Sequence, residues 1–166
     1  MSRPSFNSAW AAAQRIFDPR DPSARVAQVV GGAVARNINA PPPQNWKNTC
    51  AVRISFVLNE TGLPVPALAR KTVSGGDKRN YFYRVKDVIE FLHRRWGKPD
   101  SVLQYPPSNA SALVGKRGLI LFQVSGWGDA SGHATLWNGS VCYDHCYFNE
   151  PGANYRTDRA NFWRLP

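Results

Sequence analysis

The chain has 166 residues, a length typical of one domain with its own hydrophobic core, and we treat residues 1–166 as a single domain. Hydrophobic residues make up 43% and charged residues 19%, which excludes a disordered chain, and no apolar run approaches the roughly 18 residues of a membrane span. Lysine and arginine exceed aspartate and glutamate by 21 to 11. The resulting net charge of +10 predicts an anionic partner: nucleic acid, an acidic protein, or a polyanionic wall or membrane surface.

The N-terminal third predicts two helices. The first spans about residues 8–17, and the second runs from Ser23 to about Arg36 with a stripe of valines on one face. Gly31 and Gly32 weaken this second helix or mark a close approach to another helix. The start of the chain has no apolar signal-peptide core, so we expect no ordinary secretion.

Cys50 is predicted at the first turn of a helix that continues to about Asn59. Thr49 or Asn48 would cap it by accepting a free backbone N–H. The helix dipole and the free N–H groups favour negative charge there, so the thiol is expected to ionise readily and to act as a nucleophile. The alternative is that Cys50 is a small apolar residue that only packs in the core.

The middle of the chain predicts one further helix. Pro64 and Pro66 make residues 63–70 irregular, and the polar stretch 72–80 reads as an exposed, mobile loop that could border a cleft. Residues 85–96 form a helix that Gly97 ends. His93 lies off its apolar face and is interpreted as a surface residue.

The second half predicts antiparallel strands. Residues 118–124 read as a buried strand, 126–132 as a loop, 133–144 as a hairpin around Asn138-Gly139, and 160–165 as a last strand. Helices first and strands later favour an α+β fold.

The hairpin predicts a close pair of polar side chains. With Asn138 and Gly139 as the two turn residues, His133 pairs with Asp144, and directly opposed residues have Cβ atoms about 4.5–5.5 Å apart. The Asp144 carboxylate would then orient the imidazole and stabilise its protonated form. With Cys50, this gives a nucleophile, a base and a group that orients the base. The alternative is a surface His–Asp pair that only stabilises the hairpin.

Three segments carry a resemblance to a known family. They are Asn48-x-Cys50-Ala51-x-Arg53-x-Ser55-x-x-Leu58-Asn59, Gly132-His133-x-x-Leu136-Trp137-Asn138-Gly139, and Asp144 followed by Tyr147-Phe148. On these residues the chain resembles the fourth family of type VI secretion amidase effectors over roughly residues 45–150.

The resemblance implies a papain-like (NlpC/P60-type) fold, with Cys50 as nucleophile, His133 as general base and acid, and Asp144 as its orienter. It implies cleavage of the amide between D-glutamate and meso-diaminopimelate in peptidoglycan peptide stems. It also implies delivery by the secretion apparatus into the periplasm of a rival bacterium, and an immunity protein that blocks the cleft.

The proposed chemistry needs an oxyanion site and a surface for substrate. The Cys50 backbone N–H is expected to give one oxyanion hydrogen bond, and Gln44, Asn45 or Asn48 the second. Trp127 is a candidate for the cleft wall. No metal or other cofactor is predicted, because no cysteine–histidine cluster has zinc spacing. Six basic residues are candidates to hold wall carboxylates, each also readable as plain surface: Lys71, Lys78, Arg79, Arg84, Arg94 and Arg95.

Cys142 and Cys146 are the remaining cysteines, and an oxidising periplasm would favour their pairing. Residues four apart in a continuous strand lie about 13 Å apart, beyond the roughly 7 Å limit for a disulfide. A bond therefore requires the chain to curl after Asp144; the alternative is two free thiols.

Two other readings stay open. A basic nucleic-acid-binding module would use the positive charge, although no recognised motif of that class is present, so we expect no nucleic-acid partner and no membrane insertion. A cysteine protease or transglutaminase-like enzyme would use the same three residues on a protein substrate.

Overall fold

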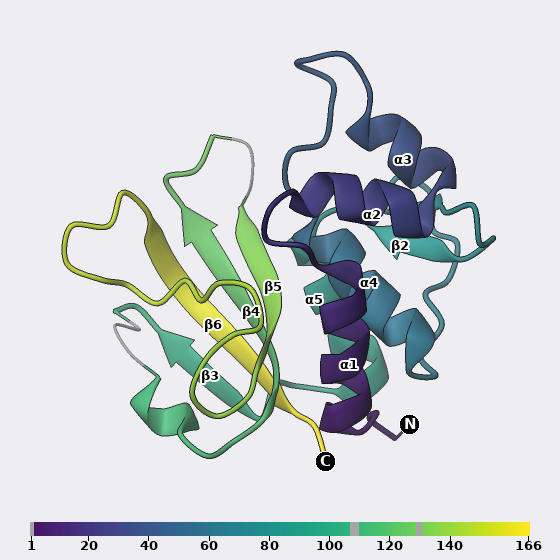
Figure 1. The fold of residues 1–166 in the computed structure, drawn as a ribbon. Coiled ribbons are helices and arrows are strands. Elements are labelled where there is room, and N and C mark those ends of the chain that lie inside the picture. The colour runs from purple at the N-terminus through teal and green to yellow at the C-terminus, as the bar shows by residue number, and fades with distance from the viewer. Residues whose placement is uncertain (1, 107–109, 129–130) are drawn as a thin grey trace.

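The computed structural model describes residues 2–106, 110–128 and 131–166, and it shows helices packed beside an antiparallel sheet (Figure 1). The strand order is β3–β6–β4–β5, and all neighbouring pairs are antiparallel. The four strands are β3 (Ser101–Gln104), β4 (Gly118–Ser125), β5 (Gly132–Trp137) and β6 (Arg156–Arg164). The predicted α+β class is confirmed. Within the described ranges, no helix combines the length and apolar character that crossing a bilayer requires.

The N-terminal helices begin at side-chain caps. In α1 (Phe6–Ile16) the Ser5 hydroxyl accepts the Ser8 N–H at 3.1 Å, so the helix starts earlier than predicted. The prediction of one continuous helix from Ser23 to about Arg36 was wrong. Asp21 caps α2 (Pro22–Val30), and a separate α3 (Gly32–Ile38) follows Gly31.

Gly31 and Gly32 break the predicted helix because both adopt positive φ angles, 66° and 58°. They also bring the backbone against the segment predicted as a loop, which is instead a hairpin of β1 (Thr72–Ser74) and β2 (Asn80–Phe82). The Gly76 N–H donates to the Val30 carbonyl at 2.8 Å, and a Cβ on Gly32 would lie 2.5 Å from the Gly75 carbonyl carbon. The two glycines therefore allow the junction between α2 and α3 to pack closely against the turn of the β1–β2 hairpin.

Two helices match the sequence pattern closely. α4 (Cys50–Glu60) starts at Cys50, and α5 (Val85–Trp96) has the predicted limits. His93 is exposed and residues 63–70 form no helix or strand, as predicted. In the predicted 126–132 loop, residues 129–130 lie outside the described part.

The sheet is covered on both faces, and alternate residues of β4 face opposite cores. Leu119 and Leu121 pack in the cluster that contains the helices. Ile120 and Phe122 belong to a second cluster, closed by Phe148 and by the 3-10 turn η1 (Ser111–Leu113). This double burial explains the apolar run that identified the strand. The sheet edge at β5 lies beside α4, and this junction positions the candidate site.

Candidate active site

Cys50 is the first residue of α4, and its free thiol is 2% exposed. Residues 46–49, which belong to no helix or strand, lead into the helix, whose first hydrogen bond runs from the Arg53 N–H to the Thr49 carbonyl at 2.9 Å. Across the junction, the Cys50 sulfur lies 4.0 Å from the Gly132 carbonyl oxygen on β5. The thiol thus faces the strand that carries His133.

His133 lies on β5, is 6% exposed, and contacts both other predicted site residues. Its Nε2 lies 3.0 Å from Asp144 Oδ2, and its imidazole interacts with the Cys50 thiol. Nε2 makes no regular hydrogen bond within the described part of the chain, so its contact with Asp144 is an ion pair when the imidazole is protonated.

The turn that brings Asp144 to His133 differs from the predicted two-residue turn. The Asn138 N–H donates to the Val141 carbonyl at 3.0 Å, and Trp137 pairs with Cys142. The Asn138 side chain accepts the backbone N–H groups of residues 140 and 141, which holds this wider turn. The predicted register was therefore wrong.

Asp144 nevertheless reaches His133, for a different reason. Continuing the observed register places Asp144 opposite Thr135, and its Oδ1 accepts the Thr135 hydroxyl and, at 2.6 Å, the His145 N–H. Thr135 and His133 are two residues apart and share one face of β5, so one carboxylate reaches both.

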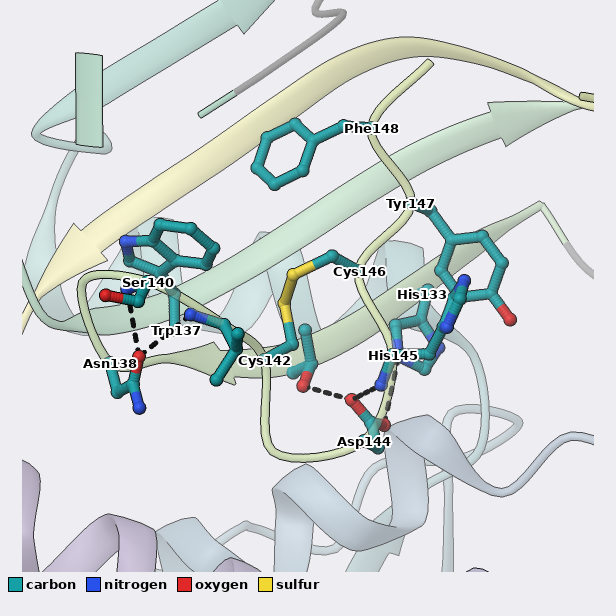
Figure 2. The surroundings of a disulfide bond; sticks show 12 residues. His133, Trp137, Asn138, Ser140, Cys142, Asp144, His145, Cys146, Tyr147 and Phe148 are labelled. Atoms are coloured by element: carbon teal, nitrogen blue, oxygen red, sulfur yellow. Dashed lines mark hydrogen bonds and ion pairs between the residues drawn. A yellow bond between two sulfur atoms is a disulfide. The ribbon is translucent and has the colours of Figure 1, made fainter. Parts of the chain in front are cut away.

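A disulfide fixes the backbone around this carboxylate. Cys142 and Cys146 are bonded, with Cα atoms 5.5 Å apart, so the chain curls as a bond at that spacing requires. Figure 2 shows the bridge closing a small loop with Asp144 at its far side, next to His133 and His145.

The three groups favour a thiolate–imidazolium pair. Burial of the thiol opposes ionisation, but the hydrogen bond and charge of His133 outweigh it and lower the pKa of Cys50. Burial likewise disfavours the imidazolium, yet the contacts with Asp144 and Cys50 raise the pKa of His133 to about 9. The pKa of Asp144 is lowered despite burial, chiefly by His133 and then by the charge of Arg53. A nucleophilic cysteine requires this charge distribution.

A cavity of about 610 Å³ opens beside Cys50. It lies between the segment that precedes α4 and the segment that enters α5. The predicted residues Gln44, Asn45 and Asn48 line it, together with Pro43, Trp46, Lys47, Cys50, Ala51, Tyr83, Arg84, Val85, Ser131 and Gly132.

Two predictions about this groove need correction. The Cys50 N–H, expected at the oxyanion, donates instead to Asn48 Oδ1 at 3.0 Å, because the side chain two residues before the helix caps it. Trp127 is not among the described lining residues; it packs against Tyr147 and Tyr155 with ring centroids 4.8 and 5.9 Å away.

Of the six basic candidates, Arg84 lines the groove. Its guanidinium is held by Asp87 at 2.7 Å and by the Arg70 carbonyl at 2.9 Å. The other candidates do not line it: Lys71 and Arg94 pair with Glu90, Arg79 pairs with Glu60, Arg95 lies over the Phe91 ring, and Lys78 is exposed.

Sequence reasoning missed several residues of the site. Lys47, Trp46 and Tyr83 line the groove, and the rings of Trp46 and Tyr83 stack with centroids 5.2 Å apart. Arg53 was also missed, although it is the one charged residue in the otherwise uncharged run 50–59 and is only 6% exposed. A single charged residue in an apolar helix predicts a buried side chain paired with an opposite charge, and this signal could have identified Arg53.

The family model described as type VI secretion system (T6SS), amidase effector protein 4 matches residues 46–163. The effector Tae4 from Enterobacter cloacae is 40% identical, with a TM-score of 0.85 and 100% of both chains covered. Tae4 from Salmonella typhimurium, solved with the immunity protein Tai4 from Enterobacter cloacae, is 38% identical, with a TM-score of 0.85, covering 99% of this chain and 100% of that one. The Tae4–Tai4 complex from Enterobacter cloacae is 40% identical, with a TM-score of 0.86 and 99% of each chain covered. A comparison with curated proteins finds no match. The chain therefore belongs to the family of type VI secretion system amidase effector protein 4.

Proposed function

We propose that this amidase effector is a papain-like (NlpC/P60-type) cysteine hydrolase that cleaves the D-glutamyl–meso-diaminopimelate amide of peptidoglycan stems. The observation that carries the proposal is the contact of Cys50, His133 and Asp144 at the junction of α4 and β5. A helix that presents a nucleophile beside a strand that presents the base is the arrangement expected of such an enzyme.

The reaction begins with attack of the Cys50 thiolate on the γ-carbonyl carbon of the glutamyl residue. His133 then protonates the departing amine, which leaves a thioester on Cys50. Water, deprotonated by His133, hydrolyses the thioester and restores the thiol. The Asp144 carboxylate keeps the imidazole in place through both steps, because its position is set by the disulfide loop.

Side chains must supply the hydrogen bonds to the oxyanion, because the Cys50 N–H already donates to Asn48 Oδ1. Asn48 accepts that N–H with its oxygen, so its amide N–H₂ group is the proposed donor to the oxyanion. Asn45 lines the same groove, and its side-chain oxygen has no hydrogen-bond partner in the described part of the chain. Because that oxygen is buried, it would reach a peptide N–H of the stem only after the side chain turns into the groove.

The stem carries free carboxylates, and the groove offers two cations to hold them. Lys47 and Arg84 line it, and Arg84 is kept in place by Asp87 and the Arg70 carbonyl. A guanidinium with a fixed orientation binds a carboxylate at lower entropic cost than a mobile one. The stacked Trp46 and Tyr83 rings form an apolar wall for the aliphatic part of diaminopimelate.

The net charge of +10 would concentrate the protein on an acidic wall. The solved relatives are described as type VI effectors in complex with the immunity protein Tai4. We propose that this chain is likewise delivered by the secretion apparatus, acts in the periplasm of a target cell, and has a cognate immunity protein that covers the groove.

Purified sacculi test the proposal. The wild type should release one new amine per cleavage and fragments whose masses end at D-glutamate, whereas Cys50→Ala should release neither. A protein substrate is tested in parallel. Cleavage or cross-linking of that protein would indicate a general cysteine protease or a transglutaminase-like enzyme instead. If the wild type leaves sacculi intact, the proposed substrate is wrong.

A further inference from the structure

Arg53 is a buried cation that the mechanism above does not use. It lies one helical turn after Cys50 on α4, is 6% exposed, and its charged group bonds to three side chains. Nη2 donates to Asp144 Oδ2 at 2.9 Å, Nε to the Tyr143 hydroxyl at 3.1 Å, and Nη1 to the Thr49 hydroxyl at 3.3 Å. Burying a guanidinium is costly unless it is fully paired, and here it is paired at every nitrogen.

The Asp144 oxygen that Arg53 contacts is the one that faces His133. Arg53 Nη2 and His133 Nε2 lie 2.9 and 3.0 Å from the same Oδ2 atom. The other oxygen, Oδ1, accepts from Thr135 and from the His145 backbone. The carboxylate is therefore fixed from α4, from β5 and from its own loop, and it cannot rotate away from the imidazole without breaking the Arg53 contact.

The charges also balance. In the reactive state Cys50 and Asp144 are negative and His133 is positive, so these three buried groups alone sum to one negative charge. Arg53 adds the missing positive charge and forms an alternating series with Asp144, His133 and Cys50. An uncompensated charge in such a buried site would be strongly disfavoured.

We propose that Arg53 is a positioning residue that clamps Asp144 against His133 and neutralises the buried site, so that Cys50 reacts as a thiolate. The inference rests on the proposed cysteine mechanism. Arg53 does not touch the reacting atoms. It acts through Asp144 and through its charge.

A pH profile separates this role from a merely structural one. The groups that face Arg53 are Thr49 at the N-cap of α4, Cys50 on α4, and Tyr143 and Asp144 on the disulfide loop. The Phe17 ring covers the guanidinium carbon at 5.0 Å. Those that face His133 are Cys50, Asp144 and Tyr147, whose ring centroid lies 4.8 Å away. Burial raises the pKa of Tyr143 well above its usual range, so Tyr143 stays neutral and does not add a limb to the profile.

The experiment measures the rate of Cys50 alkylation by iodoacetamide against pH, which needs no substrate. The disulfide-bonded cysteines do not react, so the signal belongs to Cys50. For the neutral variants Arg53→Gln and Arg53→Met, the acidic limb should move up by about one pH unit, a tenfold loss of thiolate below the limb. Hydrolysis of sacculi near neutral pH should fall roughly 10- to 100-fold, the range of a charge-assisted hydrogen bond.

Two variants are matched controls. Arg53→Lys keeps the charge and should keep the acidic limb within about 0.3 pH units. Arg20→Gln removes one positive charge from an exposed side chain of 86% relative accessibility, and its profile should match the wild type. Folding of each variant is checked by thermal unfolding.

The outcomes are distinct. A folded neutral variant with the wild-type limb overturns the role of Arg53 and leaves the proposed function standing. If no neutral variant folds, the Arg53→Lys variant decides the question. If that variant folds and its Cys50 titrates as an ordinary thiol, the proposed role of Arg53 is also overturned. A wild type whose Cys50 titrates as an ordinary thiol contradicts the proposed function itself.

Discussion

The proposed nucleophile, Cys50, and the carboxylate proposed to orient the base, Asp144, are held by two different kinds of structure. Cys50 starts a helix whose residues 50–58 are all buried, so its position follows from regular hydrogen bonding and core packing. Asp144 lies in a segment without regular structure between the end of β5 and the start of β6. It is held by a disulfide, by Arg53 and by Thr135. The position of Cys50 therefore depends on the packing of the whole core, whereas the position of Asp144 depends on a few individual bonds that single substitutions can remove.

The largest expected effect comes from the acidic side chain itself. Asp144→Asn removes the charge that stabilises the imidazolium and changes which nitrogen of His133 carries the proton, so sacculus hydrolysis should fall roughly 10²- to 10⁴-fold. Arg53 would also lose its ion-pair partner. The free energy of unfolding should therefore drop by about 3–5 kcal/mol, measured by urea titration. Unchanged hydrolysis in a folded variant would remove Asp144 from the site.

The disulfide is the next largest contribution. The double variant Cys142→Ser/Cys146→Ser opens a loop with a sequence separation of 4, so the free energy of unfolding should fall by about 2 kcal/mol. Hydrolysis should fall about tenfold, because Asp144 then samples positions away from His133. Intact-mass measurement without reductant checks the starting point: the wild type should be lighter than its reduced form by the mass of two hydrogen atoms. A variant as active as the wild type would show that Arg53 and Thr135 hold the carboxylate unaided.

The smallest effect is expected at Trp127, which packs with Tyr147 and Tyr155 outside the described groove lining. Trp127→Leu should change kcat/KM for a soluble stem peptide by less than about threefold, since Trp127 is not among the described residues that line the groove. The matched variant inside the groove is Trp46→Leu. It should raise KM about tenfold by removing the stacked wall with Tyr83. Equal effects of the two variants would contradict the assigned groove.

The contrast between regular elements and individually bonded loops also explains which parts of the fold could be predicted from the sequence. Helical spacing of buried residues predicted α4 and α5, and burial on both faces produced the apolar run that predicted β4. The split at Gly31 and the hairpin around Gly75 were missed because they depend on a contact between distant backbones.

For the site, proximity of His133 and Asp144 was predicted from a turn rule that did not apply. Asn138-Gly139 has the sequence of a two-residue turn, but the Asn138 side chain accepts two backbone N–H groups and widens it. The occupied Cys50 N–H was missed for a similar reason, since a cap by Asn48 instead of Thr49 depends on local backbone geometry. Such side-chain-to-backbone bonds leave no periodic signal.

The most direct test of the central account is the pH dependence of kcat/KM on a soluble stem peptide. Thiolate forms as the pH rises through the lowered pKa of Cys50, and the imidazolium that protonates the leaving amine is lost as the pH rises through about 9 at His133. Activity should therefore rise on the acidic side, stay level through neutral pH, and fall above about pH 9. A profile that rises near the ordinary histidine pKa of about 6.5 and shows no alkaline fall would contradict the thiolate–imidazolium pair.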